Sequence, residues 1–299
     1  FLQGQMQKLQ HLPVCLDASL GQALLIDATV SGGNGDYSYS WSPTDTVVDP
    51  TVEDAQVSPQ GTVTYNLEVT DSAMNVGSEG VTVHVADKAW DMQADCQLVE
   101  WADGSGSPDP VWTYADAGTT VCESENALGG AHLCPVEFTH ARLTGSFEVN
   151  DDDDDTIGLL WGYQNPNQFY AFIWKKDLQD SGHATYCPSE EIPAGMAIKR
   201  VDGTDVDSFD IICVEDTVNS SLLLGPDEIT TAGWEAGVTY DFELVHDGAD
   251  STITVRRADD QSVVATATIN DATFPEGFAG PFSHSQPNVC TSNWRTSCV

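Results

Sequence analysis

Segments in which apolar and polar residues alternate run through most of the chain, a pattern typical of β-strands with one buried face. Residues 62–70 (TVTYNLEVT) and 240–246 (YDFELVH) alternate along their whole length. An Asp247-Gly248 turn leads from the second segment into residues 251–256 (STITVR), which predicts a β-hairpin. Because no long segment has helical periodicity, the pattern predicts an all-β protein.

Residues 157–163 (IGLLWGY) and 169–174 (FYAFIW) are almost continuously apolar and aromatic instead of alternating. Strands that are covered on both faces have this composition. A turn at Asn165-Pro166-Asn167 separates the two segments. They are therefore predicted to form two antiparallel central strands joined by that turn.

Five consecutive aspartates precede the first central strand: Asp151, Asp152, Asp153, Asp154 and Asp155. Carboxylates are hard oxygen ligands of the kind that Ca²⁺ prefers. Alternate side chains of an extended segment point to opposite sides, so we expect two or three of the five to bind one ion or a pair of ions. Since carboxylates this close repel one another, cation binding should couple to local folding. The alternative is a solvated acidic loop.

A second candidate calcium loop is the sequence DGTDVD, which places Asp202, Asp205 and Asp207 around a glycine. An ordinary acidic turn is the alternative for this segment.

Three aromatic residues near predicted loops, Trp101, Trp112 and Tyr114, are candidates for stacking on the faces of sugar rings. Core packing is the alternative for each of them.

The 299 residues include 47 Asp and Glu but 10 Lys and Arg, for a formal net charge of −37. Such a surface repels phosphate groups, which excludes nucleic acid as a partner and disfavours anionic membranes. No apolar run reaches the roughly 18 residues that cross a bilayer, so we expect no membrane insertion. Cations are the natural partners of this surface, although solubility or a salty habitat would also account for the charge.

Eight cysteines without a Cys-x-x-Cys pair, and without histidines at zinc-finger spacing, favour a disulfide framework over zinc. Disulfides imply an oxidising, extracellular or periplasmic compartment. From short separations along the chain we expect the pairs Cys122–Cys134, Cys290–Cys298 and Cys187–Cys213.

The length predicts about two domains. Residues 1–15 read as an N-terminal arm or linker, and residues 16–87 as a small β-sandwich around Trp41. The strings SGGNGDYSYSWSP and GTVTYNLEVT within the latter resemble PKD-type or bacterial immunoglobulin-like repeats. This resemblance implies a spacer or adhesive module of a secreted protein.

Residues 88–299 resemble the C-terminal, legume-lectin-like domain of thrombospondins. The resemblance rests on DDDDDTIGLLWGYQ and NQFYAFIWKK, followed in order by AGMAIK, a Gly-Trp pair before YDFEL, and GPFSHSQ. It implies a concanavalin-type jelly-roll sandwich that is stabilised by calcium and used outside the cell. The chain departs from the family in lacking upstream Asp-x-Asp-x-Asp-Gly repeats and in having five acidic residues where the family has three.

Sequence motifs of three enzyme classes are absent: Gly-x-Ser-x-Gly, His-Glu-x-x-His and Glu-x-Asp-x-Glu. We therefore expect a non-catalytic, secreted, calcium-binding protein of the cell surface or matrix, whose partner is an extracellular protein or glycan. The alternatives are a carbohydrate-binding module of a larger secreted protein and a subunit of an extracellular filament or coat that self-assembles through residues 1–14. Since the chain starts at Phe1, we expect a mature, processed chain or a piece of a longer one.

Overall fold

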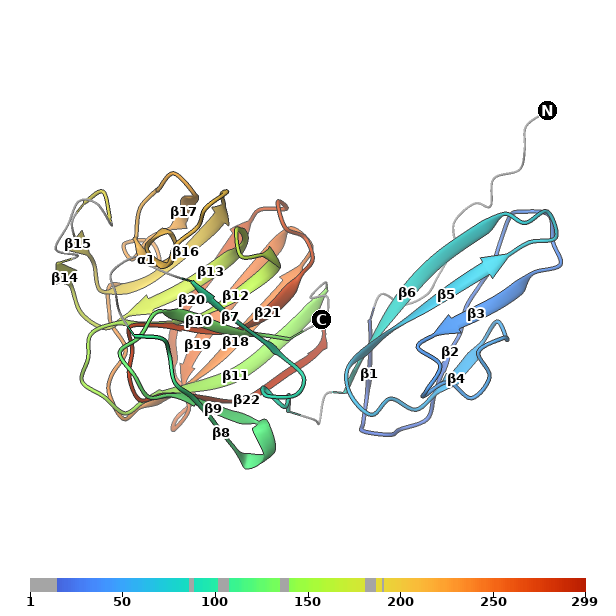
Figure 1. Ribbon diagram of the computed structural model, residues 1–299, viewed down its shortest axis with the longest axis horizontal. Helices are drawn as coiled ribbons and strands as arrows, with labels where there is room; N and C mark the ends of the chain where they lie inside the picture. Colours follow the sequence, from blue (N-terminus) through green and yellow to red (C-terminus); the bar gives the residue numbers. More distant parts are fainter. Residues whose placement is uncertain (1–14, 86–88, 102–107, 135–139, 181–186, 190) are drawn as a thin grey trace. The chain divides into compact units, whose positions relative to one another are not determined.

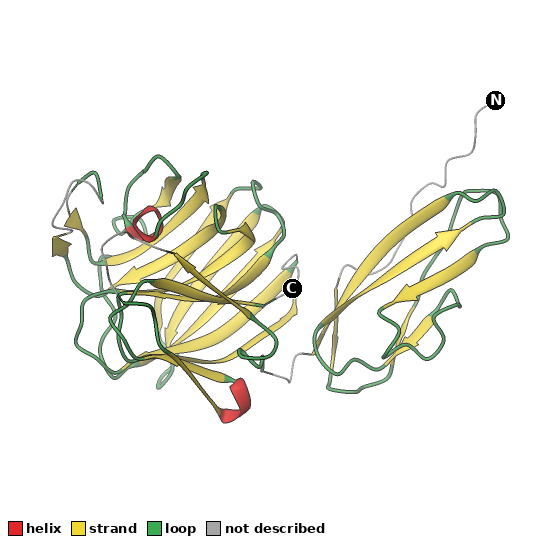
Figure 2. Cartoon of the chain, viewed as in Figure 1, coloured by secondary structure: helices red, strands yellow, loops and turns green. Residues whose placement is uncertain are grey.

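The computed structural model describes residues 15–85, 89–101, 108–134, 140–180, 187–189 and 191–299. Strands dominate these residues, so the prediction of an all-β protein is confirmed (Figure 2). The chain divides into two compact units, one ending at Lys88 and including Thr296–Cys298, the other comprising Ala89–Arg295 and Val299 (Figure 1). Among the described residues, no helix is long and apolar enough to cross a membrane.

The first unit contains a four-stranded sheet and a two-stranded sheet around a small apolar core. The larger sheet has the order β1-β6-β5-β3, with β1 (Cys15–Ala18), β6 (Val76–Val85), β5 (Val63–Thr70) and β3 (Ser38–Ser42). The smaller one pairs β2 (Leu24–Ile26) with β4 (Ala55–Val57). Alternate residues of β5 are buried beside Trp41, as the sequence pattern predicts. The assignment to the PKD type stays a prediction.

The second unit is a sandwich of two seven-stranded sheets. The first, here called the β12 sheet, has the order β17-β16-β13-β12-β21-β10-β7. Its strands are β7 (Gln97–Trp101), β10 (Gly129–Leu133), β12 (Thr156–Asn165), β13 (Gln168–Lys175), β16 (Gly195–Asp202), β17 (Ser220–Leu224) and β21 (Phe278–His284). Leu159 pairs with Phe172 in the β12–β13 hairpin, which confirms the predicted antiparallel central strands.

The second sheet, here called the β18 sheet, has the order β20-β19-β18-β11-β22-β9-β8. Its strands are β8 (Trp112–Ala115), β9 (Thr120–Glu123), β11 (Ala141–Val149), β18 (Thr239–Asp247), β19 (Asp250–Arg257), β20 (Val263–Asn270) and β22 (Val289–Cys298). The short elements of this unit are η1 (Asp116–Gly118), α1 (Ser208–Ile212), β14 (Gln179–Asp180) and β15 (Glu191–Ile192). The predicted β18–β19 hairpin is confirmed.

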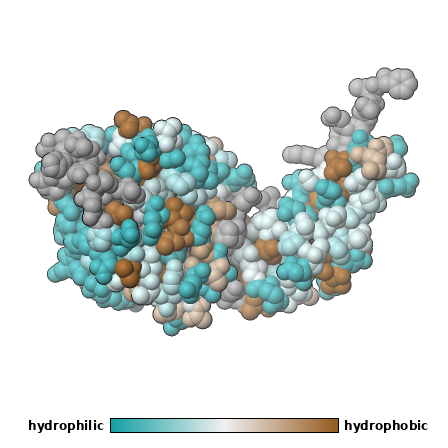
Figure 3. All heavy atoms as spheres, viewed as in Figure 1, coloured by the Kyte–Doolittle hydropathy of each residue, from teal (hydrophilic) through white to brown (hydrophobic). Residues whose placement is uncertain are grey.

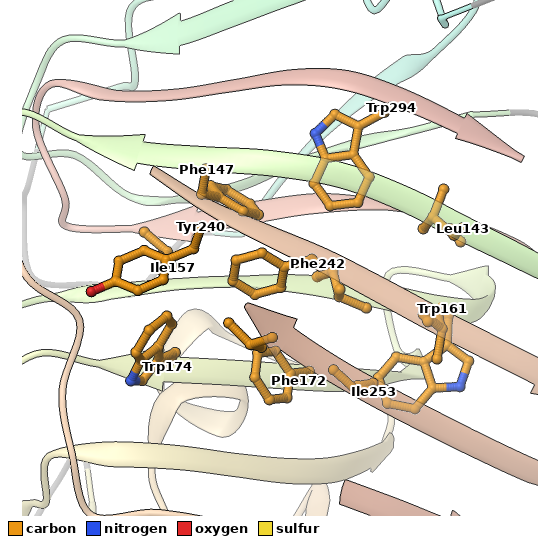
Figure 4. Close-up of a cluster of buried hydrophobic side chains, with 14 of the residues drawn as sticks. Leu143, Phe147, Ile157, Trp161, Phe172, Trp174, Tyr240, Phe242, Ile253 and Trp294 are labelled. Carbon is orange, nitrogen blue, oxygen red and sulfur yellow. The ribbon is translucent and has the colours of Figure 1, made fainter. Parts of the chain in front are cut away.

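Aromatic side chains fill the space between the two sheets (Figure 4). The Trp174 ring lies 4.7 Å from the Tyr240 ring, and the Phe172 ring lies 5.9 Å from the Phe242 ring. Alternate residues of β18 face this core, including Tyr240, Phe242 and Leu244. The residues between them, Asp241 and Glu243, therefore project from the outer face of the β18 sheet.

A second apolar cluster covers the outer face of the β12 sheet. Phe169, Ala171 and Ile173 of β13 contribute to it, together with Ile211 and Ile212 of α1. Strands β12 and β13 are consequently buried on both faces, which explains their continuous apolar sequence.

The four disulfides join Cys15 to Cys298, Cys96 to Cys134, Cys122 to Cys290 and Cys187 to Cys213. The expected Cys187–Cys213 pair is confirmed, whereas the pairs Cys122–Cys134 and Cys290–Cys298 are wrong. Cys122 of β9 lies directly opposite Cys290 of β22, so a neighbouring strand supplies its partner from 168 residues away.

Candidate calcium site

The aspartate run forms the loop between β11 and β12, and Asp155 directly precedes the first residue of β12. The structure brings three of the five side chains together. Asp153, Asp154 and Asp155 each offer a carboxylate oxygen, and these oxygens all lie within 4.8 Å of one another. Asp155 is the buried member of the group, at 4% exposed.

Lys175, the last residue of β13, places its ammonium group beside these carboxylates. Its ammonium nitrogen donates to the carbonyl oxygen of Asp154 at 2.7 Å and lies 3.2 Å from Oδ1 of Asp155. Burial nevertheless raises the pKa of Asp155 to about 6, because the cost of desolvating its carboxylate outweighs the attraction of Lys175. The charges of Asp154 and Asp153 raise this pKa further.

The backbone of Asp155 is held by two buried side chains from other elements. Its amide donates to Oε1 of Gln286 at 3.2 Å, and its carbonyl accepts a hydrogen bond from the indole nitrogen of Trp234 at 3.1 Å. Gln286 and Trp234 are 0% and 2% exposed. The position of the Asp155 carboxylate is thus fixed by the sandwich core.

The exposed end of the run is held by polar contacts with neighbouring loops. Asp151 accepts hydrogen bonds from the Asn288 side chain and from the Asp153 amide, which lower the pKa of Asp151. Asp153 accepts a hydrogen bond of 2.6 Å from the Asn126 side chain. Asp152 pairs with Lys176 at 2.9 Å, although its own side chain is 95% exposed.

The donor set at Asp153–Asp155 fits a hard cation such as Ca²⁺. Lys175 balances only part of the negative charge of three neighbouring carboxylates, so a residual attraction for a cation remains. The backbone carbonyl groups of Asp152 and Asp154 already accept hydrogen bonds from the ammonium groups of Lys176 and Lys175. An ion bound here would therefore be held mainly by the carboxylates and by water.

In the second predicted calcium loop, the carboxylates of Asp202 and Asp207 already accept hydrogen bonds from the protein. The Asp207 carboxylate caps α1 by accepting hydrogen bonds from the amides of Phe209 and Asp210. Asp202 accepts one from the Gln168 side chain. Within the described part of the chain, Asp202, Asp205 and Asp207 do not form a three-ligand group.

The candidate aromatic residues lie in packed positions. Trp101 is 2% exposed and packs against Phe169 and Phe282, so the expectation of an exposed stacking ring is wrong for Trp101. Trp112 and Tyr114 are half-buried on β8 and contact the ring of His132 edge-on. Burial lowers the pKa of His132 to about 4, so its imidazole is neutral at pH 7.

Sequence reasoning missed the partners of the aspartate run, above all Lys175 and Gln286. Lys175 had a detectable signal, since a lysine that directly follows six apolar residues of a central strand has little access to water. Gln286 had none, because it follows a strand that lies more than a hundred residues further along the chain.

The thrombospondin C-terminal region, as a protein family, matches residues 107–299. The chain belongs to the thrombospondin C-terminal family. It is 28% identical over 214 residues to thrombospondin-4 of Bos taurus, an alignment that covers 70% of this chain and 22% of that protein. It is also 28% identical over 214 residues to cartilage oligomeric matrix protein of Bos taurus, covering 70% of this chain and 28% of that protein.

The chain thus spans less than a third of the length of these relatives. Among solved structures, lectin II from Ulex europaeus is 12% identical and covers 72% of this chain and 94% of that one, with a TM-score of 0.41. A carbohydrate-binding module from Bacillus subtilis is 11% identical, covering 67% of this chain and 97% of that one, with a TM-score of 0.41. Likeness at this level adds no argument about function.

Proposed function

We propose that this chain acts outside the cell as a calcium-binding, non-catalytic protein of adhesion or matrix assembly. Membership of the thrombospondin C-terminal family supports the proposal, as does similarity to a protein named as an oligomeric component of cartilage matrix. Four disulfides suit an oxidising compartment. In the face shown by Figure 3, apolar residues lie as separate spots on a mostly hydrophilic surface.

The observation that carries the proposal is the group of carboxylates at Asp153, Asp154 and Asp155. A cation at this group would relieve their mutual repulsion and tie the β11–β12 loop to the sandwich core through Asp155. Anything that binds the folded state alone stabilises it, so calcium should raise the melting temperature.

Thermal unfolding in millimolar calcium and in EDTA tests this proposal. We expect a higher melting temperature in calcium for the natural protein and for the double variant Asp202→Asn/Asp205→Asn, which alters the second predicted loop. The variant Asp153→Asn/Asp154→Asn should lose the difference. Equal melting temperatures in calcium and EDTA for the natural protein, with no heat of calcium binding in calorimetry, would refute the calcium proposal.

Self-assembly into a filament or coat remains an alternative. It depends on residues 1–14, which lie outside the described residues. Electron micrographs of the chain with and without this segment would test it, because unchanged assembly after its deletion contradicts a docking role.

A further inference from the structure

A polar groove of about 320 Å³ lies on the outer face of the β18 sheet, away from the aspartate run. Strands β11, β18, β19 and β22 all contribute to its lining. The side chains that line it include Ser146, Asp241, Glu243, Arg256 and Arg295. Its volume falls within the range of about 300–1,000 Å³ that is usual for small-ligand pockets.

The arginines of the groove differ from the other arginines of the chain. The chain has five arginines and 47 acidic residues. Three arginines have a carboxylate partner: Arg142 pairs with Glu243, Arg200 with Asp271 and Arg257 with Glu235. For Arg256 and Arg295, no carboxylate of the described residues lies within ion-pair distance. Both of these guanidinium groups line the groove, and Nε of Arg295 donates a hydrogen bond to the Asn293 carbonyl at 3.4 Å.

The carboxylates of the groove, in contrast, already have donors. Asp241 accepts hydrogen bonds from the Ser146 hydroxyl at 2.8 Å and from the Gln261 amide at 2.9 Å. Glu243 is paired with Arg142 at 3.3 Å. Both carboxylates of the groove thus have hydrogen-bond donors or an ion pair, whereas neither of its arginines has a carboxylate partner among the described residues, in a protein whose net charge is −37.

The rest of the lining is suited to a ligand rich in hydroxyl groups. Thr144 offers a hydroxyl group. Gln261 and Asn293 offer their amide oxygens, since the Gln261 nitrogen donates to Asp241 and Ala258 and the Asn293 nitrogen donates to Ser292. Phe242, the aromatic residue of the lining, is 1% exposed and faces the core, so it presents no ring to a ligand. This composition favours a saccharide over an apolar peptide. Guanidinium groups bind carboxylates through two parallel hydrogen bonds.

We infer that this groove binds a uronate-containing saccharide, with Arg256 and Arg295 engaging its carboxylates and the neutral polar side chains its ring hydroxyls. The net charge of the whole protein does not prevent this, because surface charges more than about 8 Å away are largely screened at physiological ionic strength. The inference shares no residue with the calcium site, so each stands or falls independently.

Isothermal titration calorimetry with trigalacturonate and with the neutral trisaccharide maltotriose tests the inference, in calcium and again in EDTA. We expect trigalacturonate to bind in both buffers, at least about tenfold more tightly than maltotriose. The variants Arg256→Gln and Arg295→Gln should each weaken trigalacturonate binding about tenfold, since each removes a charge-assisted hydrogen-bonding group. The matched control is Arg257→Gln, which removes the same charge from a neighbouring position where the arginine is paired with Glu235.

Binding that is unchanged in Arg257→Gln but about tenfold weaker in both groove variants, with unchanged thermal unfolding, supports the inference. Three results would overturn it: no heat with trigalacturonate, equal affinity for maltotriose, or equal losses in all three arginine variants. The last would show that only net charge matters. Titrations in EDTA measure saccharide binding without calcium, so they distinguish a failure of the groove to bind from a failure of the aspartate run to bind calcium.

Discussion

The ammonium nitrogen of Lys175 lies 3.2 Å from Oδ1 of Asp155, and the two side chains are 2% and 5% exposed. This pair joins the end of β13 to the entrance of β12, since Lys175 and Thr156 are partners in the β12–β13 ladder. Its position identifies the innermost aspartate as part of the sandwich core and not as a freely solvated acid.

Removing Lys175 should therefore destabilise the protein strongly. In EDTA, we expect Lys175→Met to lower the free energy of unfolding by about 3–5 kcal/mol, because it leaves Asp155 buried without its counter-ion. Lys176→Met is the matched control. Lys176 is itself 16% exposed and lies over the Trp234 ring, but its partner Asp152 is 95% exposed and stays solvated without it, so the loss should be clearly smaller than for Lys175→Met. Urea denaturation of both variants gives the comparison. Equal losses would mean that the buried pair has no special role.

Glu123 should make stability depend on pH. Burial raises the pKa of this carboxyl, which is 3% exposed, from 4.5 to about 7, so the folded state retains its proton where the unfolded state has lost it. The stabilisation is complete below pH 4.5 and is lost as the pH rises through about 7, by up to about 3 kcal/mol. Glu123→Gln should remove this component from the pH profile of unfolding, whereas Glu125→Gln, at an exposed position, should leave it. A profile that Glu123→Gln leaves unaltered would exclude Glu123 as its source.

Peptide mapping without reduction should recover Cys122 linked to Cys290 and Cys96 linked to Cys134. A peptide that links Cys122 to Cys134 would contradict the structure.

The Cys187–Cys213 bond closes a loop across 26 residues of sequence, so replacing both cysteines by serine should lower the free energy of unfolding by about 3 kcal/mol. Chemical denaturation measures this loss. A loss near zero would mean that α1, which packs on the outer face of the β12 sheet, holds its position without the bond.

Gly145, the glycine of β11, is not expected to tolerate a side chain. A Cβ atom at this position would overlap the buried ring of Trp294, so Gly145→Ala should cost about 1–3 kcal/mol or more through overpacking. Gly225→Ala is the control, because its nearest neighbour would lie 3.5 Å away, an ordinary contact distance. Thermal unfolding of the two variants tests the difference, and a tolerated alanine at 145 would show that Trp294 can move.

The strands of the second unit could be predicted because their signals are local. Alternation in residues 240–246 and continuous apolar sequence in residues 157–174 each report the burial of a strand's own faces. The family resemblance carried by the same segments was correct as well.

What could not be predicted depends on which strands become neighbours. Cys122 meets Cys290 because β9 pairs with β22, and the short separation between Cys122 and Cys134 contains no information about that pairing. The same holds for the calcium site, where the acidic run was visible in the sequence but its anchor Gln286 was not. Trp101 is the last residue of β7, and its ring packs against Phe169. Its proximity to a loop in the sequence does not reveal this packing.

The bond between Cys15 and Cys298, which are 283 positions apart in the sequence, closes the stretch between them into a covalent ring. A pulling force that enters the chain ahead of Cys15 and leaves it after Cys298 is carried by this bond, and the strands within the ring bear none of it. In an optical-tweezers experiment with handles on either side, the ring should lengthen only after a reductant is added. Such a protein would act under tension as an inextensible link, with its folded units protected from mechanical unfolding.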